Sequence, residues 1–284
     1  MNSYINVPVA PKMQDARRTE SIKLYGSDAF EGMRRAGALT ARCLDGVSDL
    51  ILNGTALAQI NRFVLDFAAT HDATPATLGY KGYQYACCTS VNHVICHGFP
   101  NEKKLRDGDI VNVDVTLIHD GWYGDSSRMY VVGKPKRAAE RLIQIAHEAM
   151  MRGIRTVHPG ARLGDIGHAI QSYAHSERCS VVRDFCGHGI GQVFHDSPNI
   201  LNFGKADTGP ELREGMIFTV EPMINLGRAD VKMLADNWTA VTRDKSLSAQ
   251  FEHSIGVTSD GFEIFTRSPM GLHAPGIELQ TVPA

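Results

Sequence analysis

DIVNVDVTLIHDGWYGD, residues 109–125, is the stretch that predicts the central hairpin of the fold. Valine or leucine at every second position alternates with polar residues, including Asp114 and Thr116, so the strand has one apolar and one polar face. Asp120-Gly121 is a strong signal for a two-residue turn, which would place Thr116 opposite Asp125. Asp114 would then lie diagonally beside Asp125, with backbones about 7–8 Å apart. Two carboxylates this close can share a cation, and without one they would repel each other.

Two later segments place an acidic residue inside an otherwise apolar strand pattern. Glu221 lies on one face of the predicted strand 216–223, and Glu252 lies on one face of the predicted strand 249–257. For the hairpin alone, a solvated face with two surface aspartates would be the simpler interpretation. Buried carboxylates are unfavourable unless they are paired or bound to a metal, so three such strands together predict convergence on cations.

A glycine-flanked histidine supplies a nitrogen donor for the same site. Residues 186–191 read CGHGIG, and the glycines around His188 let other backbone segments approach closely. A glycine turn around a core histidine is the alternative. The segment is not a dinucleotide-binding loop, because Gln192 occupies the position of the third glycine. Four carboxylates and one histidine suit a pair of Mn, Fe(II), Co or Zn ions.

The composition limits the class of protein. The chain has 284 residues, of which 43% are hydrophobic, and its 29 basic residues nearly balance 31 acidic ones, so neither a nucleic-acid nor a membrane partner is expected. The six cysteines form no Cys-x-x-Cys pair, and Asp15 and Glu20 interrupt any N-terminal signal segment. A cytoplasmic location is therefore expected, with a mitochondrial presequence as a minor alternative.

An internal repeat organises the chain after an aperiodic arm at residues 1–20. One helix is predicted to begin at Ser27 and Asp28, which are followed by Glu31. Another is predicted over residues 138–154. The repeat consists of a glycine followed by an apolar helical stripe, and it occurs twice at one constant offset. Its two copies are Gly54, Leu57, Ile60, Val64 and Phe67, then Gly160, Leu163, Ile166, Ile170 and Tyr173. A glycine-rich β region follows each copy, which predicts two similar α/β halves that face each other.

The chain resembles the type I methionine aminopeptidases from about residue 22 to residue 269. The resemblance rests on five motifs in order: NVDVT around Asp114, GDSS around Asp125, CGHGIG around His188, TVEPM around Glu221 and SLSAQFEH around Glu252. It implies an α+β pita-bread (creatinase/aminopeptidase) fold, with two pseudo-symmetric α/β halves around a curved antiparallel sheet. The implied organisation is an N-terminal arm at residues 1–20 and a single catalytic domain at 21–284. Its halves cover about 21–135 and 136–270, followed by a short C-terminal tail.

The resemblance also implies roles for individual residues. Asp125 and Glu252 would bridge two divalent cations, Asp114 would bind one of them through both oxygens, and His188 and Glu221 would complete the other. Glu221 would be the proton acceptor as well as a ligand, with His97 and His195 as the other catalytic and substrate-binding residues. A monovalent cation would bind at Asn92, Val94 and Ser248.

A methionine side chain would lie in a pocket formed by aromatic residues and one cysteine. The implied pocket residues are Tyr80, Tyr83, Cys88, Phe194 and Trp238. Thr77 departs from the pattern, because many relatives carry a small cysteine or similar residue there. Cys87 and Cys88 have no evident base partner in the sequence, which argues against a cysteine peptidase.

The implied function is removal of the initiator methionine from nascent polypeptides when the second residue is small. The implied enzyme is a monomer that acts near the ribosome. One rival is an Xaa-Pro aminopeptidase or prolidase, which usually carries a large N-terminal domain, whereas only about 20 residues precede the first predicted helix here. A second is a type II methionine aminopeptidase, whose helical insertion has little room between His195 and Glu221. A third is a non-catalytic binding protein, which the complete ligand set disfavours.

Overall fold

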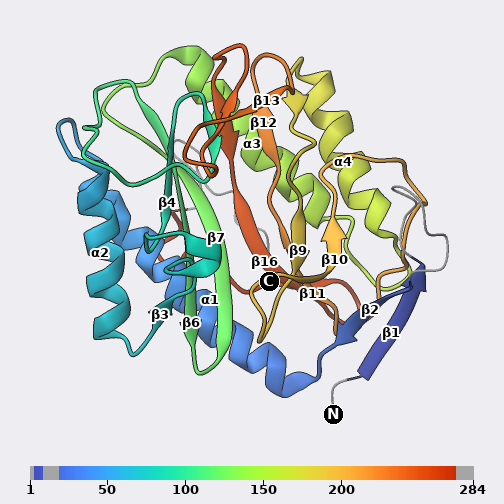
Figure 1. Cartoon of the computed structure of the whole chain (residues 1–284). Helices are drawn as coiled ribbons and strands as arrows, with labels where there is room; N and C mark the ends of the chain where they lie inside the picture. The colour runs from blue at the N-terminus through green and yellow to red at the C-terminus, as the bar shows by residue number, and fades with distance from the viewer. Residues whose placement is uncertain (1–2, 9–18, 273–284) are drawn as a thin grey trace.

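The computed structural model describes residues 3–8 and 19–272 (Figure 1). Its α-helices are α1 (Ser27–Val47), α2 (Leu57–Thr70), α3 (Arg137–Ile154) and α4 (Leu163–Ser176), with short 3-10 helices at Ser48–Leu50 and Tyr80–Gly82. The strands are β1 (Ser3–Pro8), β2 (Thr19–Leu24), β3 (Thr74–Pro75), β4 (Cys88–Val91), β5 (Val94–Cys96), β6 (Ile110–His119), β7 (Trp122–Val131), β8 (Ser180–Val181), β9 (Gly187–Gly189), β10 (Asp196–Ile200), β11 (Ile217–Val220), β12 (Met223–Asn225), β13 (Val231–Met233), β14 (Ala240–Thr242), β15 (Ser248–Gln250), β16 (Glu252–Val257) and β17 (Phe262–Ile264). Within the described ranges, no helix combines the length and apolar character needed to cross a membrane.

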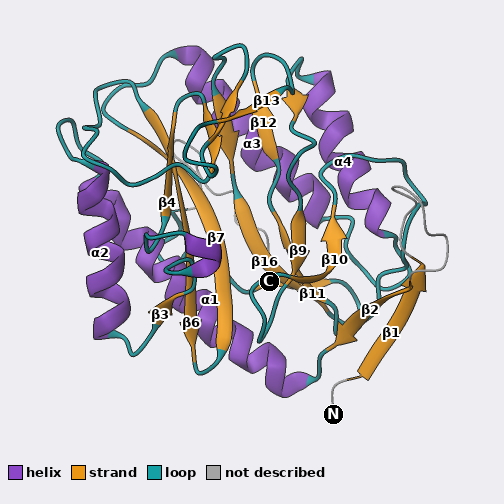
Figure 2. Ribbon diagram, viewed as in Figure 1, coloured by secondary structure: helices purple, strands orange, loops and turns teal. Residues whose placement is uncertain are grey.

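A nine-stranded antiparallel sheet forms the centre of the molecule. Its strand order is β10-β9-β11-β16-β7-β6-β3, with β4 also paired to β6 and β17 to β16. Helix α1 packs against β6 and β7, whereas α3 packs against β11, β12 and β15 and against α4. Figure 2 shows α2 to the left of the strands and α4 to their right, with α1 crossing below and behind β6 and β7. This arrangement confirms the predicted α+β class.

The predicted hairpin is confirmed in its register. Strands β6 and β7 pair Thr116 with Asp125 and Asp114 with Ser127, so the two aspartates are diagonal neighbours. The turn residues Asp120 and Gly121 both have positive φ, of 50° and 76°, as a two-residue turn of this kind requires. The valines and leucine of the alternating face are fully buried in a cluster with side chains of α1 and α2.

The internal repeat is also confirmed. Helices α2 and α4 both have 14 residues, and each follows a glycine with φ of 91°, Gly54 and Gly160. In each helix a side chain of the first turn accepts a hydrogen bond from the preceding backbone, from Ala56 N to Gln59 and from Arg162 N to Asp165. Each helix packs its apolar stripe into a separate hydrophobic cluster. The exact boundaries of the two halves stay a prediction.

Two features near the N-terminus bear on the sequence predictions. Helix α1 begins at Ser27, as predicted, and Gly26 is its N-cap, with no side chain in the capping role. The arm at residues 1–20 was predicted to be extended and aperiodic; of its described residues, Ser3–Pro8 form β1, which pairs antiparallel with β2. Backbone hydrogen bonds between strands need no apolar periodicity, which explains why the sequence pattern did not reveal this pair.

Two predicted strands are in fact each broken at mid-length. In segment 216–223, β11 ends at Val220, and Met223 begins β12 in a different, three-stranded sheet. Pro222 lacks the N–H that a continuing strand would use, so Glu221 lies at the break. In segment 249–257, β15 and β16 belong to different sheets and Glu252 is the first residue of β16. Both glutamates therefore lie where the chain passes from one sheet to another.

Candidate metal centre

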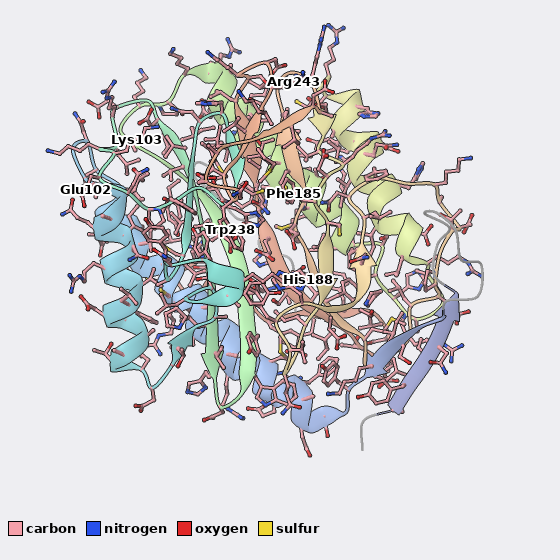
Figure 3. The ribbon with its side chains drawn as sticks, in the orientation of Figure 1. Glu102, Lys103, Phe185, His188, Trp238 and Arg243 are labelled. Atoms are coloured by element: carbon pink, nitrogen blue, oxygen red, sulfur yellow. The ribbon has the colours of Figure 1, made fainter. Side chains whose placement is uncertain are left out.

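One cavity of about 320 Å³ collects the predicted site residues. The residues that line it come from both halves of the chain: Thr77, Tyr80, Lys81, Tyr83, Cys88, His97, Asp114, Thr116, Asp125, Asp184, Phe185, Cys186, His188, Phe194, His195, Glu221, Met223, Trp238 and Glu252. In Figure 3, Trp238, Phe185 and His188 are labelled around the middle of the molecule, where the two halves meet. All five predicted metal ligands line this cavity.

The hairpin contributes two aspartates with different surroundings. Thr116 Oγ1 donates a 2.7 Å hydrogen bond to Asp125 Oδ1, and Ser254 Oγ donates to the backbone carbonyl of Asp125 at 2.7 Å. Burial raises the pKa of Asp114 well above its ordinary value, and the charges of Asp125 and Glu221 raise it further. In the absence of a cation, Asp114 would therefore tend to stay protonated.

His188 is held by its backbone neighbours. An added Cβ at Gly187 would collide with the Thr219 carbonyl, so only glycine lets β9 approach β11 this closely. His188 Nδ1 lies 3.0 Å from the Gly189 carbonyl, which favours a proton on Nδ1 and leaves Nε2 as the free donor atom. Nε2 is 3.5 Å from Asp125 Oδ2 and 3.7 Å from Glu221 Oε1.

The ring of His188 is strongly affected by these carboxylates. Burial lowers its pKa, but the hydrogen bond to Asp125 and the charges of Glu221 and Asp125 outweigh burial and bring the pKa to about 9. Without a cation, His188 would be protonated at pH 7, and its imidazolium would supply the positive charge that a cation otherwise provides at the centre.

The two glutamates lie in the same acidic environment. Burial raises the pKa of Glu221 to about 7, with a further increase from Asp125 and a decrease from His188. Burial also raises the pKa of Glu252, and Asp125 and Glu221 raise it further. Thr219 Oγ1 donates to Glu221 Oε1 at 2.9 Å, and Gln250 Nε2 lies 3.4 Å from Glu221 Oε2.

This donor set fits divalent cations. Ligand atoms of Asp125, His188 and Glu252 all lie within 4.8 Å of one another. Glu221 lies next to this cluster, with Oε1 3.7 Å from His188 Nε2. Asp114 also lies next to it, because it is the diagonal neighbour of Asp125 in the hairpin. Oxygen donors with one imidazole suit first-row divalent metals, and cations would replace the protons that the raised pKa values otherwise favour.

Two further histidines line the cavity in an uncharged state. Burial lowers the pKa of His195 to about 4, and the nearby His188 lowers it further. Burial also lowers the pKa of His97. The His195 ring stacks on Tyr80 with centroids 5.1 Å apart, and the His97 ring is 6.0 Å from that of Trp238. Both rings can therefore act as neutral hydrogen-bonding groups at pH 7.

The predicted side-chain pocket is aromatic on several sides. Tyr80 lies 4.9 Å from Phe194 and Tyr83 lies 5.0 Å from Trp238, measured between ring centroids. Tyr83 donates a 3.0 Å hydrogen bond from its hydroxyl to the Cys87 carbonyl, so its polar atom is satisfied inside the wall. Thr77 directs its hydroxyl to the Tyr85 carbonyl at 2.9 Å, which keeps it from acting as a free polar group in the cavity.

Cys87 and Cys88, beside the cavity, are not activated. Burial raises the pKa of Cys87 and Cys88 well above the ordinary value, and the charges of neighbouring acidic groups raise both further. A buried thiol that holds its proton is a poor nucleophile, which supports the exclusion of a cysteine peptidase.

The three residues of the predicted monovalent cation site are adjacent. The Asn92 carbonyl accepts a 2.9 Å hydrogen bond from Ser248 N, and Val94 pairs with Val241 on β14. The Asn92 side chain bridges Asp109 Oδ1 and Ile110 N. The cation itself stays a prediction.

Five lining residues were not predicted from the sequence: Lys81, Asp184, Phe185, Cys186 and Met223. Met223 stands two positions after Glu221 in the same motif, so alternation could have placed both on one face. Phe185 and Asp184 lie in a loop before β9, where periodicity gives no information about direction.

Comparisons with known proteins agree with this geometry. Residues 31–259 match Metallopeptidase family M24. Methionine aminopeptidase from Rickettsia prowazekii is 57% identical over 256 residues, covering 90% of this chain and 99% of that protein. Methionine aminopeptidase A from Synechocystis sp. is 48% identical over 87% of this chain and 98% of that protein. The crystal structure of the Rickettsia prowazekii enzyme has a TM-score of 0.86, covering 86% of this chain and 99% of that chain.

The likeness to a proline-directed peptidase shows the fold alone. The Xaa-Pro dipeptidase from Bacillus anthracis is 22% identical with a TM-score of 0.69, and the match covers 87% of this chain but 62% of that one. The resemblance to type I methionine aminopeptidases is therefore confirmed. The chain belongs to metallopeptidase family M24, and within that family to the methionine aminopeptidases.

Proposed function

We propose that this chain removes the initiator methionine from new polypeptides whose second residue is small, by hydrolysis at a centre with two divalent cations. The observation that supports the proposal is the convergence of four carboxylates and His188 in one cavity that also has an aromatic pocket. The metal ligands would be Asp114, Asp125, His188, Glu221 and Glu252. Co, Mn, Fe(II) and Zn all suit this donor set.

The protein's own groups divide the remaining work. Cations at the centre would supply an acidified water and a polarised scissile carbonyl. Glu221 would accept the proton of that water, because its carboxylate lies at the centre, beside His188. His195 would donate a hydrogen bond to the carbonyl oxygen as charge develops there, and His97 would contact the scissile amide.

The pocket would select the first residue of the substrate. Tyr80, Tyr83, Cys88, Phe194 and Trp238 would surround the methionine side chain, whose flexible thioether packs well against aromatic rings. A second residue with a large side chain would have to fit beside the lining of the same cavity, whose volume of about 320 Å³ leaves limited space.

A monovalent cation at Asn92, Val94 and Ser248 is a further part of the proposal. Among the described residues, the buried hydroxyl Oγ of Ser248 has no hydrogen-bond partner, so this oxygen could serve as a ligand of the cation. The ribosome as a partner, a cytoplasmic location and a monomeric state remain predictions.

Cleavage of short peptides tests the proposal. The purified enzyme, supplied with Mn(II) or Co(II), should release methionine from Met-Ala-Ser and Met-Ser-Ser much faster than from Met-Leu-Ser and Met-Lys-Ser. Chelation should abolish turnover, and added Mn(II) should restore it. Preferential cleavage of Ala-Pro peptides would contradict the proposed specificity, and full activity after chelation would contradict the metal centre.

A further inference from the structure

Thr219 occupies a position between two of the predicted ligands. It lies on β11 with no exposed surface, and two hydrogen bonds use its hydroxyl. His188 N donates to Thr219 Oγ1 at 3.0 Å, and Thr219 Oγ1 donates to Glu221 Oε1 at 2.9 Å. One buried hydroxyl thus connects the backbone of one ligand to the carboxylate of another.

The direction of these hydrogen bonds is determined by chemistry. A backbone N–H can only donate, so the hydroxyl must act as acceptor toward His188. Its single proton then remains for Glu221 Oε1, and an ionised carboxylate can only accept. Valine has the same shape as threonine but can make neither bond.

Glu221 depends on such support more than a residue inside a strand would. It lies after the last residue of β11 and before Pro222, outside the regular pairing of β11 with β16. Within the described ranges, a second side-chain hydrogen bond to its carboxylate, from Gln250 Nε2, is longer at 3.4 Å. Asn202 Nδ2 reaches only its backbone carbonyl, also at 3.4 Å. Thr219 therefore makes the shortest of these hydrogen bonds to Glu221.

We propose that Thr219 is a positioning residue, whose hydroxyl holds Glu221 and the His188 backbone in the one arrangement that binds a cation between them. Because His188 Nε2 is 3.7 Å from Glu221 Oε1, a small rotation of the carboxylate would separate the two donor atoms. The inference rests on the proposed function, since it assumes that both residues are ligands. Groups that orient ligands in this way commonly change metal affinity by about 10–100-fold when removed.

Two substitutions isolate the hydroxyl. Thr219→Val removes it at constant shape, and Thr219→Ser keeps it while removing a methyl group. Co(II) affinity of the metal-free proteins is measured by calorimetry, and the visible absorption of the Co(II) forms reports ligand geometry. T219V should bind Co(II) about 10–100-fold more weakly with an altered spectrum, and T219S should stay close to the unaltered protein. In assays with Met-Ala-Ser, T219V should lower kcat more than it changes KM.

A matched control separates positioning from general loss of a buried hydroxyl. Thr242 is also buried, and its hydroxyl bonds to the Ser246 carbonyl at 2.7 Å and touches none of the five predicted ligands. T242V should retain Co(II) affinity and spectrum even if it melts at a lower temperature. If T219V does not fold, Thr219→Ala against Thr219→Ser gives the same comparison.

The outcomes distinguish this inference from the proposed function. Unchanged Co(II) affinity and spectrum in T219V would overturn the positioning role alone, as would a T219S defect as large as that of T219V. An unaltered protein that neither binds Co(II) nor cleaves Met-Ala-Ser would instead overturn the proposed function.

Discussion

The two halves of this molecule share a scaffold but build their parts of the site differently. Helices α2 and α4 match in length, in the glycine before them and in their first-turn hydrogen bond. In the first half, Asp114 and Asp125 lie on two continuous ten-residue strands, β6 and β7. In the second half, Glu221 follows the end of β11, Glu252 begins β16 and His188 belongs to the three-residue strand β9.

This difference shows which features a repeat preserves. Apolar spacing preserves helices and cores, because burial depends on the spacing rather than on individual residues. The positions of the ligands depend instead on where individual strands end. In each half, a threonine hydroxyl donates a hydrogen bond to one of the ligand carboxylates. Thr116 reaches Asp125 across a strand pair at 2.7 Å, whereas Thr219 reaches Glu221 two positions along its own chain at 2.9 Å.

Removal of one ligand from each half should have the largest effect. Asp125→Asn and Glu252→Gln should each reduce kcat/KM for Met-Ala-Ser by about a thousandfold or more, because several kcal/mol of metal-assisted stabilisation are lost. The assay is run at saturating Mn(II), with circular dichroism as the folding control. Activity within tenfold of the unaltered enzyme for either variant would show that the substituted residue is not a ligand of the centre.

The two cavity histidines also come from different halves, and their loss should have a smaller effect. His195→Ala should lower kcat by about a hundredfold with little change in KM, as expected for one hydrogen-bond donor to a developing oxyanion. His195→Gln, which keeps an N–H donor, should recover part of the loss. His97→Ala should lower kcat on the order of tenfold to a hundredfold. A change confined to KM would remove His195 from the chemical step.

The acidic cluster between the halves should make stability depend on pH when cations are absent. The folded-state pKa of Glu221 is about 7 against an ordinary 4.5, and that of His188 is about 9 against 6.5. At a pH between the ordinary pKa and the folded-state pKa of each group, the folded state binds more protons than the unfolded state. The free energy of unfolding should therefore fall, by a few kcal/mol, as pH rises from about 5 to about 9.

Urea unfolding in EDTA at several pH values measures this slope. Mn(II) should reverse the trend, because cations compete with protons for the same groups. Glu221→Gln should make the cation-free slope shallower. A stability that rises with pH in EDTA would contradict the assigned protonation states.

The smallest effect concerns the scaffold and tests the equivalence of the halves directly. Gly54 and Gly160 both have φ of 91°, and an added Cβ would have no neighbour within 4 Å at either position. Gly54→Ala and Gly160→Ala should each destabilise by about 1–2 kcal/mol from backbone strain alone, with unchanged activity. Thermal melting of both variants measures the two losses of stability. A clearly unequal pair would show that the repeat is not equivalent in structure.

Much of the site could be predicted from the sequence because its signals are local. Period-two alternation and the Asp120-Gly121 turn determine that Thr116 faces Asp125, since a shift of one residue would expose the apolar face. The same reasoning recovered the repeated helices from their apolar spacing. The identity of the five ligand candidates also followed from acidic residues in apolar strands and a histidine between glycines.

The tertiary structure alone decided where the strands break and which side chains meet. Alternation does not reveal that Glu221 and Glu252 lie where the chain changes sheets, because each break depends on a partner strand that is distant in sequence. For the same reason, only packing between segments brings Phe185 to the cavity lining and the Thr219 hydroxyl between His188 and Glu221. The sequence determined the donors and their local faces, and long-range strand pairing determined their distances.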